Sequence, residues 1–314
     1  MNNQADKPHA VSLRPPELSC WAAPTDGVRF VQERASGQAG PEVLVTALVH
    51  GNEYSGARAL HDFLHSGVKP RRGRITAAFA RFDKSQPDAS RFVDEDFNRV
   101  WSAGRLNGDE KCAELTRACE VRPFVDRASH LLDLHSMHEA CAPLLVTGLL
   151  ARNIVFATSL GTSSQVIVDA GHDDGVRMRD YGPFGLEENR RIALLLEAGQ
   201  HWAPSSLQAA RNLLMRFLIG SNAIDRGDVP SSWLLPDATP PPPVQVTHRV
   251  VARSLDFSFA GNFSGGEIIR HAGTPIAQNA GEPVLTPYDN CMLVMPSLKQ
   301  LRPGVTTVRL GRQT

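Results

Sequence analysis

The sequence predicts an α/β protein: a mixed, largely parallel central sheet flanked by helices, followed by a smaller C-terminal β domain. Three observations carry this prediction. Apolar runs rich in β-branched residues alternate with helical patterns, a proline-rich segment interrupts the chain at residues 236–243, and short strand-like pieces without helical periodicity follow it. The 314 residues are enough for one large domain or two modest ones.

The first strand is expected at residues 42–50, where EVLVTALVH is almost continuously apolar. Such a run is typical of a strand buried on both faces of a sheet. A helix is expected next, over residues 54–65, because Ala57, Leu60 and Phe63 recur at helical spacing and Gly67 supplies a stop signal. The chain therefore begins its ordered part with a strand and then a helix.

The same patterns continue towards residue 235. They predict strands at residues 74–82, 130–135, 143–147 and 165–169, and helices at residues 109–129 and 205–219. The apolar run IALLLE at residues 192–197 is too short to decide between strand and helix. Strands separated by helical patterns imply right-handed crossovers and a largely parallel sheet.

The predicted domain boundary is the segment PDATPPPP, residues 236–243. Consecutive prolines cannot continue a helix or occupy a central strand, so this segment acts as a stiff connector. We expect one domain over residues 1–235 and a β-rich domain over residues 236–314. The strand-like pieces of the second are VTHRVVARS, GEIIRHAG and CMLVMP.

Composition limits the function and its setting. Thirty-three basic residues balance 33 acidic ones, so no overall charge favours nucleic acid or an anionic membrane surface. The five cysteines are odd in number and form no CxxC pair, which indicates reduced thiols. The N-terminal 16 residues lack the apolar stretch of a signal peptide, and no run is long enough to span a bilayer. We expect a cytoplasmic protein, with homo-oligomerisation left open.

Metal-binding residue types stand at the ends of two predicted strands. His50 and Glu53 follow the first strand in HGNE, where Gly51 allows a sharp turn, and His135 ends HLLDLH. Carboxyl ends of parallel strands meet at one edge of a sheet, so the three side chains can converge there. Two imidazoles and a carboxylate form the three-ligand set of a catalytic zinc. The alternative for His135 is an ordinary buried core histidine.

The sequence leaves the roles of two neighbours of His135 undecided. Asp133 points to the same face of the strand and would orient His135 or a nearby group from behind. His138 is a competing ligand, although a pocket or surface position explains it as well.

The segment RFVDEDFNR, residues 91–99, is unusually polar for this chain. Beside a metal, Arg91 could polarise a carbonyl oxygen, while Asn98 and Arg99 could hold a substrate carboxylate. The alternative is a solvated loop in which the arginines pair with neighbouring acidic residues. Spacing alone does not separate the two interpretations.

Glu197 closes the apolar run LLLE and precedes Ala198 and Gly199. A partly desolvated carboxylate beside a metal would have its pKa set by burial and the metal charge in opposition, which suits a general base. The alternative is a surface glutamate at the end of a strand.

Taken in order, HGNE, RFVDEDFNR, LLDLHS and LLLEAG resemble the succinylglutamate desuccinylase and aspartoacylase family, which is grouped with zinc carboxypeptidases of the M14 type. The resemblance covers residues 43–199 by motif and the β-rich tail more loosely. It implies one zinc per chain, bound by His50, Glu53 and His135, with Glu197 activating water. This chain has Phe97 where the family usually has leucine, a change of packing rather than of chemistry.

The resemblance also implies roles for the polar segment. Arg91 would face the scissile carbonyl, and the pair Asn98 and Arg99 would hold the substrate carboxylate. In aspartoacylase-like members of the family, a further arginine and a tyrosine shortly before the catalytic glutamate help to select the substrate. The candidates for these two roles are Arg177, Arg179, Tyr181 and Tyr288.

The leading hypothesis is therefore zinc-dependent hydrolysis of the amide in a small N-acyl amino acid. Glu197 would serve as general base and then as general acid. Two alternatives stay open: a zinc carboxypeptidase acting on short peptides, and a non-catalytic metal-binding member of the family. The resemblance suggests that the C-terminal β domain covers the cleft and restricts entry to small molecules, which argues against the carboxypeptidase.

Overall fold

The computed structural model describes residues 11–24, 27–81, 90–171 and 174–314. Its main feature is an 11-stranded mixed sheet in the order β1-β3-β2-β4-β7-β5-β6-β8-β14-β13-β10, joined by a three-stranded sheet β12-β11-β9. The predicted fold class is confirmed. Within the described residues, no helix is both long and apolar enough to cross a membrane.

The first half of the large sheet is mostly parallel. Its strands are β1 (Val31–Ala35), β2 (Glu42–Ala47), β3 (Arg74–Phe79), β4 (His130–Met137), β5 (Leu144–Val146), β6 (Gln165–Val168) and β7 (Ile192–Gln200). β2 pairs in parallel with β3 and β4, and β4 with β7, whereas β1 and β5 are antiparallel to their neighbours β3 and β7. The ambiguous run at residues 192–197 is thus a strand.

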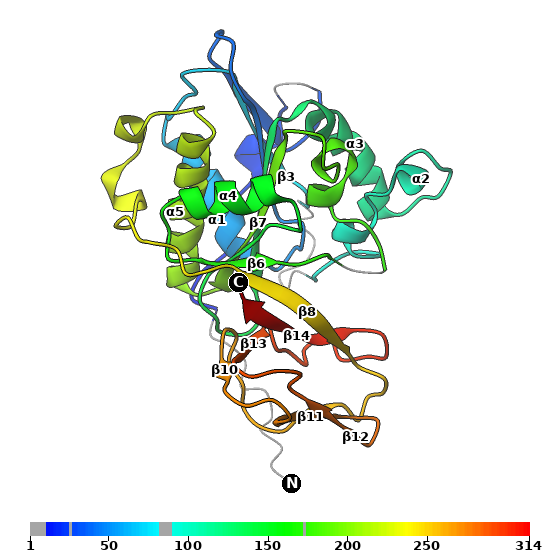
Figure 1. Ribbon diagram of the computed structural model, residues 1–314. Helices are drawn as coiled ribbons and strands as arrows, with labels where there is room; N and C mark the ends of the chain where they lie inside the picture. Colours follow the sequence, from blue (N-terminus) through cyan, green and yellow to red (C-terminus); the bar gives the residue numbers. More distant parts are fainter. Residues whose placement is uncertain (1–10, 25–26, 82–89, 172–173) are drawn as a thin grey trace.

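Helices cover both faces of this half of the sheet (Figure 1). They are α1 (Tyr54–His65), α2 (Ala103–Leu106), α3 (Ala113–Arg127), α4 (Ala151–Ser159) and α5 (Pro204–Gly220). α1, α4 and α5 pack on one face around an apolar cluster that includes Leu132 and Leu134, and α3 packs on the other around a cluster that includes Leu131. Successive residues of β4 point to opposite faces of the sheet because a strand has a two-residue period.

Several boundaries differ from those expected from the sequence. The first strand ends at Ala47, and the strand at residues 74–82 ends at Phe79; Phe82 lies outside the described residues. β1 and α4 were not predicted. β1 contains Gln32, Glu33 and Arg34 and lies at the edge of the sheet, so it lacks the apolar run that marks a central strand.

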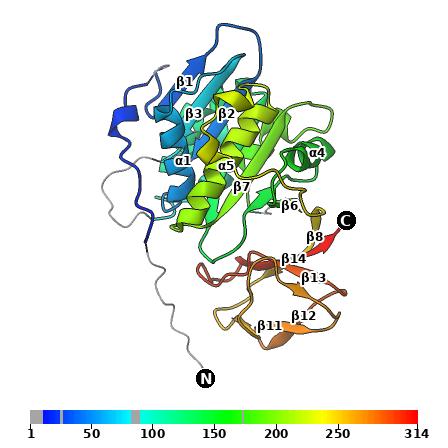
Figure 2. The same cartoon turned by 90° about the vertical axis from the view of Figure 1, so that its left-hand side faces the viewer.

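The C-terminal strands form a lobe beside the parallel part (Figures 1 and 2). They are β8 (Val244–Val251), β9 (Ser258–Phe259), β10 (Ile268–Ile269), β11 (Pro275–Asn279), β12 (Glu282–Leu285), β13 (Cys291–Val294) and β14 (Thr306–Gln313). β8 pairs in parallel with β6, so the large sheet continues past the prolines. The lobe has its own apolar cluster, and a second cluster joins Met137 and Leu144 to Val244 and Met292.

Candidate functional site

His50 and Glu53 lie in the connection between β2 and α1. His50 is 5% exposed and Glu53, the residue before the helix, is 1% exposed. His50 Nδ1 is 2.7 Å from Glu53 Oε1. Gly51 has no room for a side chain, because a Cβ there would lie 2.7 Å from the carbonyl oxygen of Ser90, and its N–H donates to the carbonyl of Arg91. Close backbone approach, rather than a special φ angle, explains this glycine.

His135 joins the pair from the neighbouring strand. β2 and β4 run parallel with Ala47 opposite Leu134, so His135 directly follows the paired segment at the same edge of the sheet. His135 Nδ1 lies 3.2 Å from His50 Nδ1 and 2.9 Å from Glu53 Oε2. One donor atom from each of the three residues lies within 4.8 Å of the other two. The convergence expected from the sequence is present in the structure.

A carboxylate contacts the Nε2 atom of each imidazole, on the side of the ring away from Glu53. His135 Nε2 lies 2.7 Å from Asp133 Oδ2, and His50 Nε2 lies 3.0 Å from Asp96 Oδ1. Asp133 also accepts from Thr46 Oγ1 at 2.7 Å. When both Nε2 atoms donate to carboxylates, the two Nδ1 atoms are unprotonated and their lone pairs face each other beside the Glu53 carboxylate. A cation bound between these three groups would remove their mutual repulsion. The donor set fits a divalent metal of the zinc type.

The pKa values of Glu53 and His135 reflect these contacts between carboxylates and imidazoles. Burial opposes the charged form of Glu53, but the two imidazoles hold its pKa well below the usual range. Burial likewise opposes the charged form of His135, whereas Asp133 and Glu53 raise its pKa well above the ordinary value. The cluster is therefore an environment that attracts positive charge.

The polar segment at residues 91–99 lies against this cluster. Arg91 donates to Glu53 Oε1 at 3.4 Å and to Asp96 Oδ2 at 3.5 Å. Arg99 Nε donates to Asp174 Oδ1 at 2.9 Å, and its Nη1 lies 3.7 Å from Asp96 Oδ2. Burial would raise the pKa of Asp96, but His50, Arg91 and Arg99 lower it. The segment thus lines the donor cluster, and both arginines pair with Asp96 as the alternative interpretation expected. The substrate-binding roles of Arg91 and Arg99 stay predictions.

Asn98 is 2% exposed and its side-chain amide is occupied. Its Nδ2 donates to Asp133 Oδ2 at 3.0 Å, and its Oδ1 accepts from the N–H of Met178 at 3.1 Å. These contacts fix the carboxylate that orients His135. The substrate-binding role expected for Asn98 stays a prediction.

Glu197 lies on β7, directly opposite His135 of β4 in the parallel register. The residue is partly exposed, but its Oε2 is buried and has no hydrogen-bond partner among the described residues. Burial and the nearby Glu53 carboxylate raise the pKa of Glu197 to about 8, against the opposing charges of His135, Arg91 and Arg309. A cation beside Glu53 would lower this pKa.

Tyr181, Tyr288 and His138 lie outside the donor cluster. Tyr181 packs against Trp101, with ring centroids 5.5 Å apart, and Tyr288 bonds to Thr247 Oγ1 at 2.6 Å within the C-terminal lobe. His138 lies beside His201, with ring centroids 5.8 Å apart, and is not a member of the three-residue donor cluster. The substrate-selecting roles considered for the two tyrosines stay predictions.

Arg177 and Arg179 gather with Arg309 around Asp169. Arg309 Nε donates to Asp169 Oδ2 at 3.0 Å, Arg177 Nη1 lies 3.9 Å from the same oxygen, and Arg179 is 1% exposed. Burial and the neighbouring Arg177 lower the pKa of Arg179 to about 10. Arg177 and Arg179 also pair with Asp180, at 2.8 and 3.1 Å, so three guanidinium groups meet two carboxylates close to the site.

Sequence reasoning missed Arg309 and the orienting role of Asp96. Arg309 belongs to β14, in the lobe assigned to a separate domain, and the strand TTVRLGRQ contains other polar residues, so nothing in it singles out Arg309. Asp96 was one of three acids in the polar segment, and no spacing rule singles it out.

The fold and the buried donor cluster define a class: α/β proteins with a His-Glu-His cluster that could hold a metal ion, at the carboxyl edge of a largely parallel sheet. Within that class, residues 39–158 match the model of the succinylglutamate desuccinylase/aspartoacylase catalytic domain. The resemblance predicted from the sequence is confirmed over the matched residues.

Solved structures support the same fold. A succinylglutamate desuccinylase/aspartoacylase from Rhodobacter sphaeroides has 18% identity and a TM-score of 0.65, with 88% of this chain and 87% of that chain covered. The succinylglutamate desuccinylase from Vibrio parahaemolyticus has 17% identity and a TM-score of 0.64, covering 91% and 86%. The product-bound ectoine utilization protein EutE (DoeB) from Ruegeria pomeroyi has 18% identity and a TM-score of 0.63, covering 90% and 89%. No curated protein matches the chain.

Proposed function

We propose that the protein is a zinc-dependent amidohydrolase that releases the acyl group from a small N-acyl amino acid. The observation that carries the proposal is the convergence of His50, Glu53 and His135 on one point, with Glu197 opposite His135 on the next strand. The family match over residues 39–158 supports the reaction class. In the reaction a water oxygen attacks the acyl carbon, the C–N bond breaks, and a carboxylic acid and an amine leave.

His50, Glu53 and His135 would hold the zinc, and Asp96 and Asp133 would orient the two imidazoles. A zinc ion bound there supplies Lewis-acid chemistry, because it polarises an acyl oxygen and lowers the pKa of water. Two nitrogen donors and one carboxylate favour zinc over the oxygen-preferring cations magnesium and calcium.

Glu197 is the general base and then the general acid of the proposal. It takes the proton from the attacking water and delivers it to the leaving nitrogen. Its buried Oε2, which has no hydrogen-bond partner among the described residues, is available for this exchange. A carboxylate whose pKa lies above the usual range accepts a proton more readily than that of an ordinary glutamate, which suits the first half of the cycle.

Arg91 would stabilise negative charge on the acyl oxygen. Its guanidinium contacts Glu53 and Asp96 only at 3.4 and 3.5 Å, so both bonds are long and can be exchanged for a shorter one to substrate. Arg99 would hold the substrate carboxylate, since its partner Asp174 is a surface side chain, 68% exposed, that a ligand can displace. Asn98 would support Arg99 and fix Asp133.

The charges around Asp169 favour a carboxylate in the acyl group as well. Arg177, Arg179 and Arg309 carry one positive charge more than the carboxylates of Asp169 and Asp180 balance, and the charge of Arg309 acts on Glu197. A second anionic end of the substrate would balance this excess. On this basis N-succinyl amino acids should be better substrates than N-acetyl amino acids.

The C-terminal lobe favours a small substrate over a peptide. We propose that residues 236–314 form a β-rich unit that restricts the cleft. Gly265 of this unit packs against Cys141, whose thiol pKa is raised to about 11 by burial and by Glu197, so the unit reaches the neighbourhood of the proposed base. A carboxypeptidase would need an open path for the peptide chain at this place.

The test uses the zinc-loaded full chain against N-succinyl and N-acetyl amino acids, dipeptides and longer peptides. We expect hydrolysis of N-acyl amino acids and none of the longer peptides. Release of C-terminal residues from peptides would support the carboxypeptidase instead. Full zinc occupancy without turnover of any compound would support a non-catalytic protein.

A further inference from the structure

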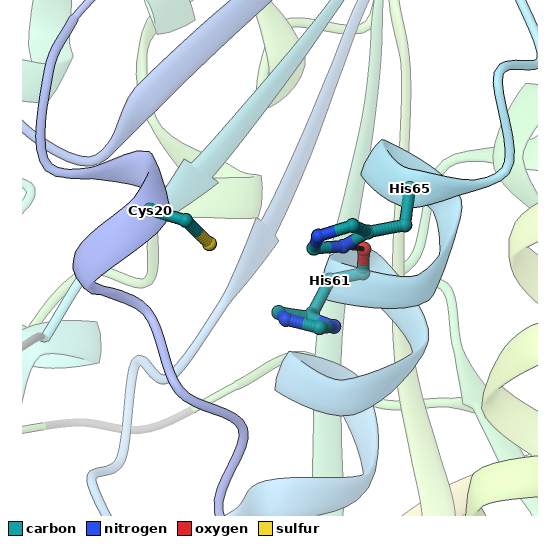
Figure 3. Close-up of side chains that lie close together, drawn as sticks. All are labelled: Cys20, His61 and His65. Carbon is teal, nitrogen blue, oxygen red and sulfur yellow. Dashed lines mark hydrogen bonds between the residues drawn. The ribbon is translucent and has the colours of Figure 1, made fainter.

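A second group of metal-binding side chains lies at the other end of α1. It consists of Cys20, His61 and His65, whose donor atoms all lie within 4.8 Å of one another (Figure 3). α1 begins directly after Glu53, and His61 and His65 occupy its last two turns. At about 1.5 Å per residue they lie roughly 12 to 18 Å along the helix from Glu53, so this group is separate from the buried cluster.

The protein holds Cys20 in place beside the helix. Cys20 belongs to a short 3₁₀ helix, Ser19–Trp21, between Leu18, which is buried in the main apolar cluster, and Trp21, which packs against it. Gln32 of β1 donates to the carbonyl of Trp21 at 3.0 Å and so ties the segment to the sheet. The thiol makes only a weak contact, 3.7 Å to the carbonyl of Glu17.

The two histidines are also oriented. They are four residues apart and therefore share one face of α1. His65 Nδ1 lies 3.0 Å from the carbonyl of His61, which makes Nδ1 the donor and leaves Nε2 as a lone pair. The Trp21 ring lies edge-on against both imidazoles, with centroids 4.7 Å from His65 and 6.2 Å from His61. In Figure 3 the Cys20 sulfur points towards the two rings.

Ring packing explains why the imidazoles lie beside Trp21, but it does not require a thiol next to both of them. Cys112, which precedes the first residue of α3, behaves otherwise: it donates to Glu95 Oε1 at 2.9 Å and accepts from the N–H of Leu115. The Cys112 sulfur is used within the fold, whereas Cys20 is exposed and faces two nitrogen ligands.

We propose that Cys20, His61 and His65 form a second, surface site for a thiolate-preferring divalent metal, with Zn²⁺ as the physiological occupant. One sulfur and two nitrogens are three of the four ligands of a tetrahedral zinc site, and the exposure of Cys20 leaves the fourth position to water. Tetrahedral donors lie roughly 3.5 Å apart, so small side-chain rotations bring the present donors into range. Occupancy would fasten the N-terminal segment to α1.

The test is cobalt titration of the metal-free full chain, followed by absorption spectroscopy. A thiolate bound to Co²⁺ gives a ligand-to-metal charge-transfer band in the near ultraviolet, and the buried His-Glu-His cluster contains no sulfur. We expect the band in the wild type and its loss in Cys20→Ser. Its retention in Cys119→Ser, the other exposed cysteine, and in Cys112→Ser is the matched control.

A second measurement distinguishes loss of this metal site from misfolding of a variant. Elemental analysis should find one fewer zinc ion per chain in Cys20→Ser and in His65→Gln than in the wild type, while His50→Ala keeps the cobalt charge-transfer band. Absence of the band from the wild type, or its persistence in Cys20→Ser, would overturn the proposal. Either result leaves the proposed hydrolase untouched, because that activity depends on the buried cluster.

Discussion

The two ends of β4 each carry a buried or partly buried histidine, and their surroundings differ sharply. His130, at the start of the strand, lies among Phe156 and Phe217, with ring centroids 5.7 and 6.3 Å away. His135, at the other end, lies between the carboxylates of Asp133 and Glu53 at 2.7 and 2.9 Å. The two are five positions apart on the strand, and an odd step places them on opposite faces of the sheet.

The pKa values of the two histidines move in opposite directions. Burial lowers the pKa of His130 to about 4, whereas the neighbouring carboxylates raise that of His135 in spite of burial. Burial alone therefore produces a neutral core imidazole. Carboxylates on both sides convert the same side chain, on the same strand, into one that attracts positive charge.

The largest effect is expected from His135→Ala. Removing one of three protein ligands should abolish zinc binding at the buried cluster and reduce amide hydrolysis to background. The measurements are zinc content and turnover on an N-succinyl amino acid. His130→Phe is the matched control, since it preserves the aromatic packing and should keep both zinc and activity. Equal losses in the two variants would contradict the distinction between the two ends of β4.

Next in size is Glu197→Gln, which keeps the shape of the side chain but cannot accept the proton. Turnover should fall by about 10² to 10⁴ while zinc content stays unchanged. Glu187→Gln, at an exposed glutamate, removes a carboxylate of the same kind and should leave turnover unaffected. Near-normal hydrolysis by the Glu197 variant would show that another group is the base.

A smaller effect is expected from Asp133→Asn, which removes the charge behind His135 but not the ligand. Zinc affinity should fall by about 10- to 100-fold, as for other residues that orient metal-binding histidines. Competition with a chromophoric chelator measures the change. Unaltered affinity would mean that the His135–Asp133 contact at 2.7 Å does not tune the ligand.

The smallest effect concerns His130 and pH. Its pKa is about 4 in the native protein and 6.5 ordinarily, so the unfolded chain binds the proton more readily. The free energy of unfolding should therefore decrease as the pH falls from 6.5 towards 4, by on the order of 2 kcal/mol from this residue. His130→Phe should flatten this part of the profile in urea unfolding. Identical slopes in both proteins would contradict a neutral buried His130.

Much of the parallel half of the sheet could be predicted from the sequence, because its strands are buried on both faces and leave long apolar runs. The carboxyl ends of two such strands then brought His50, Glu53 and His135 together. The edge strand β1 could not be found in this way, since it is polar and exposed on one side. The position of Arg309 near the site could not be predicted either, because it depends on the pairing of β8 with β6, and no local sequence pattern encodes that pairing.

The difference between His130 and His135 illustrates the same limit. The run HLLDLH contains both, and the only local distinction is Asp133, two residues before the second histidine. Asp133 marks the face that carries the donor cluster, but the aromatic neighbours of His130 come from α4 and α5, far along the chain. A sequence pattern can thus propose a ligand, while its long-range neighbours determine its charge state.

The central claim is that His50, Glu53 and His135 share one cation. The most direct measurement is an anomalous difference map at the zinc edge from crystals of the zinc-loaded protein. The account predicts a peak about 2 Å from Nδ1 of His50, Nδ1 of His135 and a carboxylate oxygen of Glu53. A fully loaded crystal with no peak among these three atoms would contradict it.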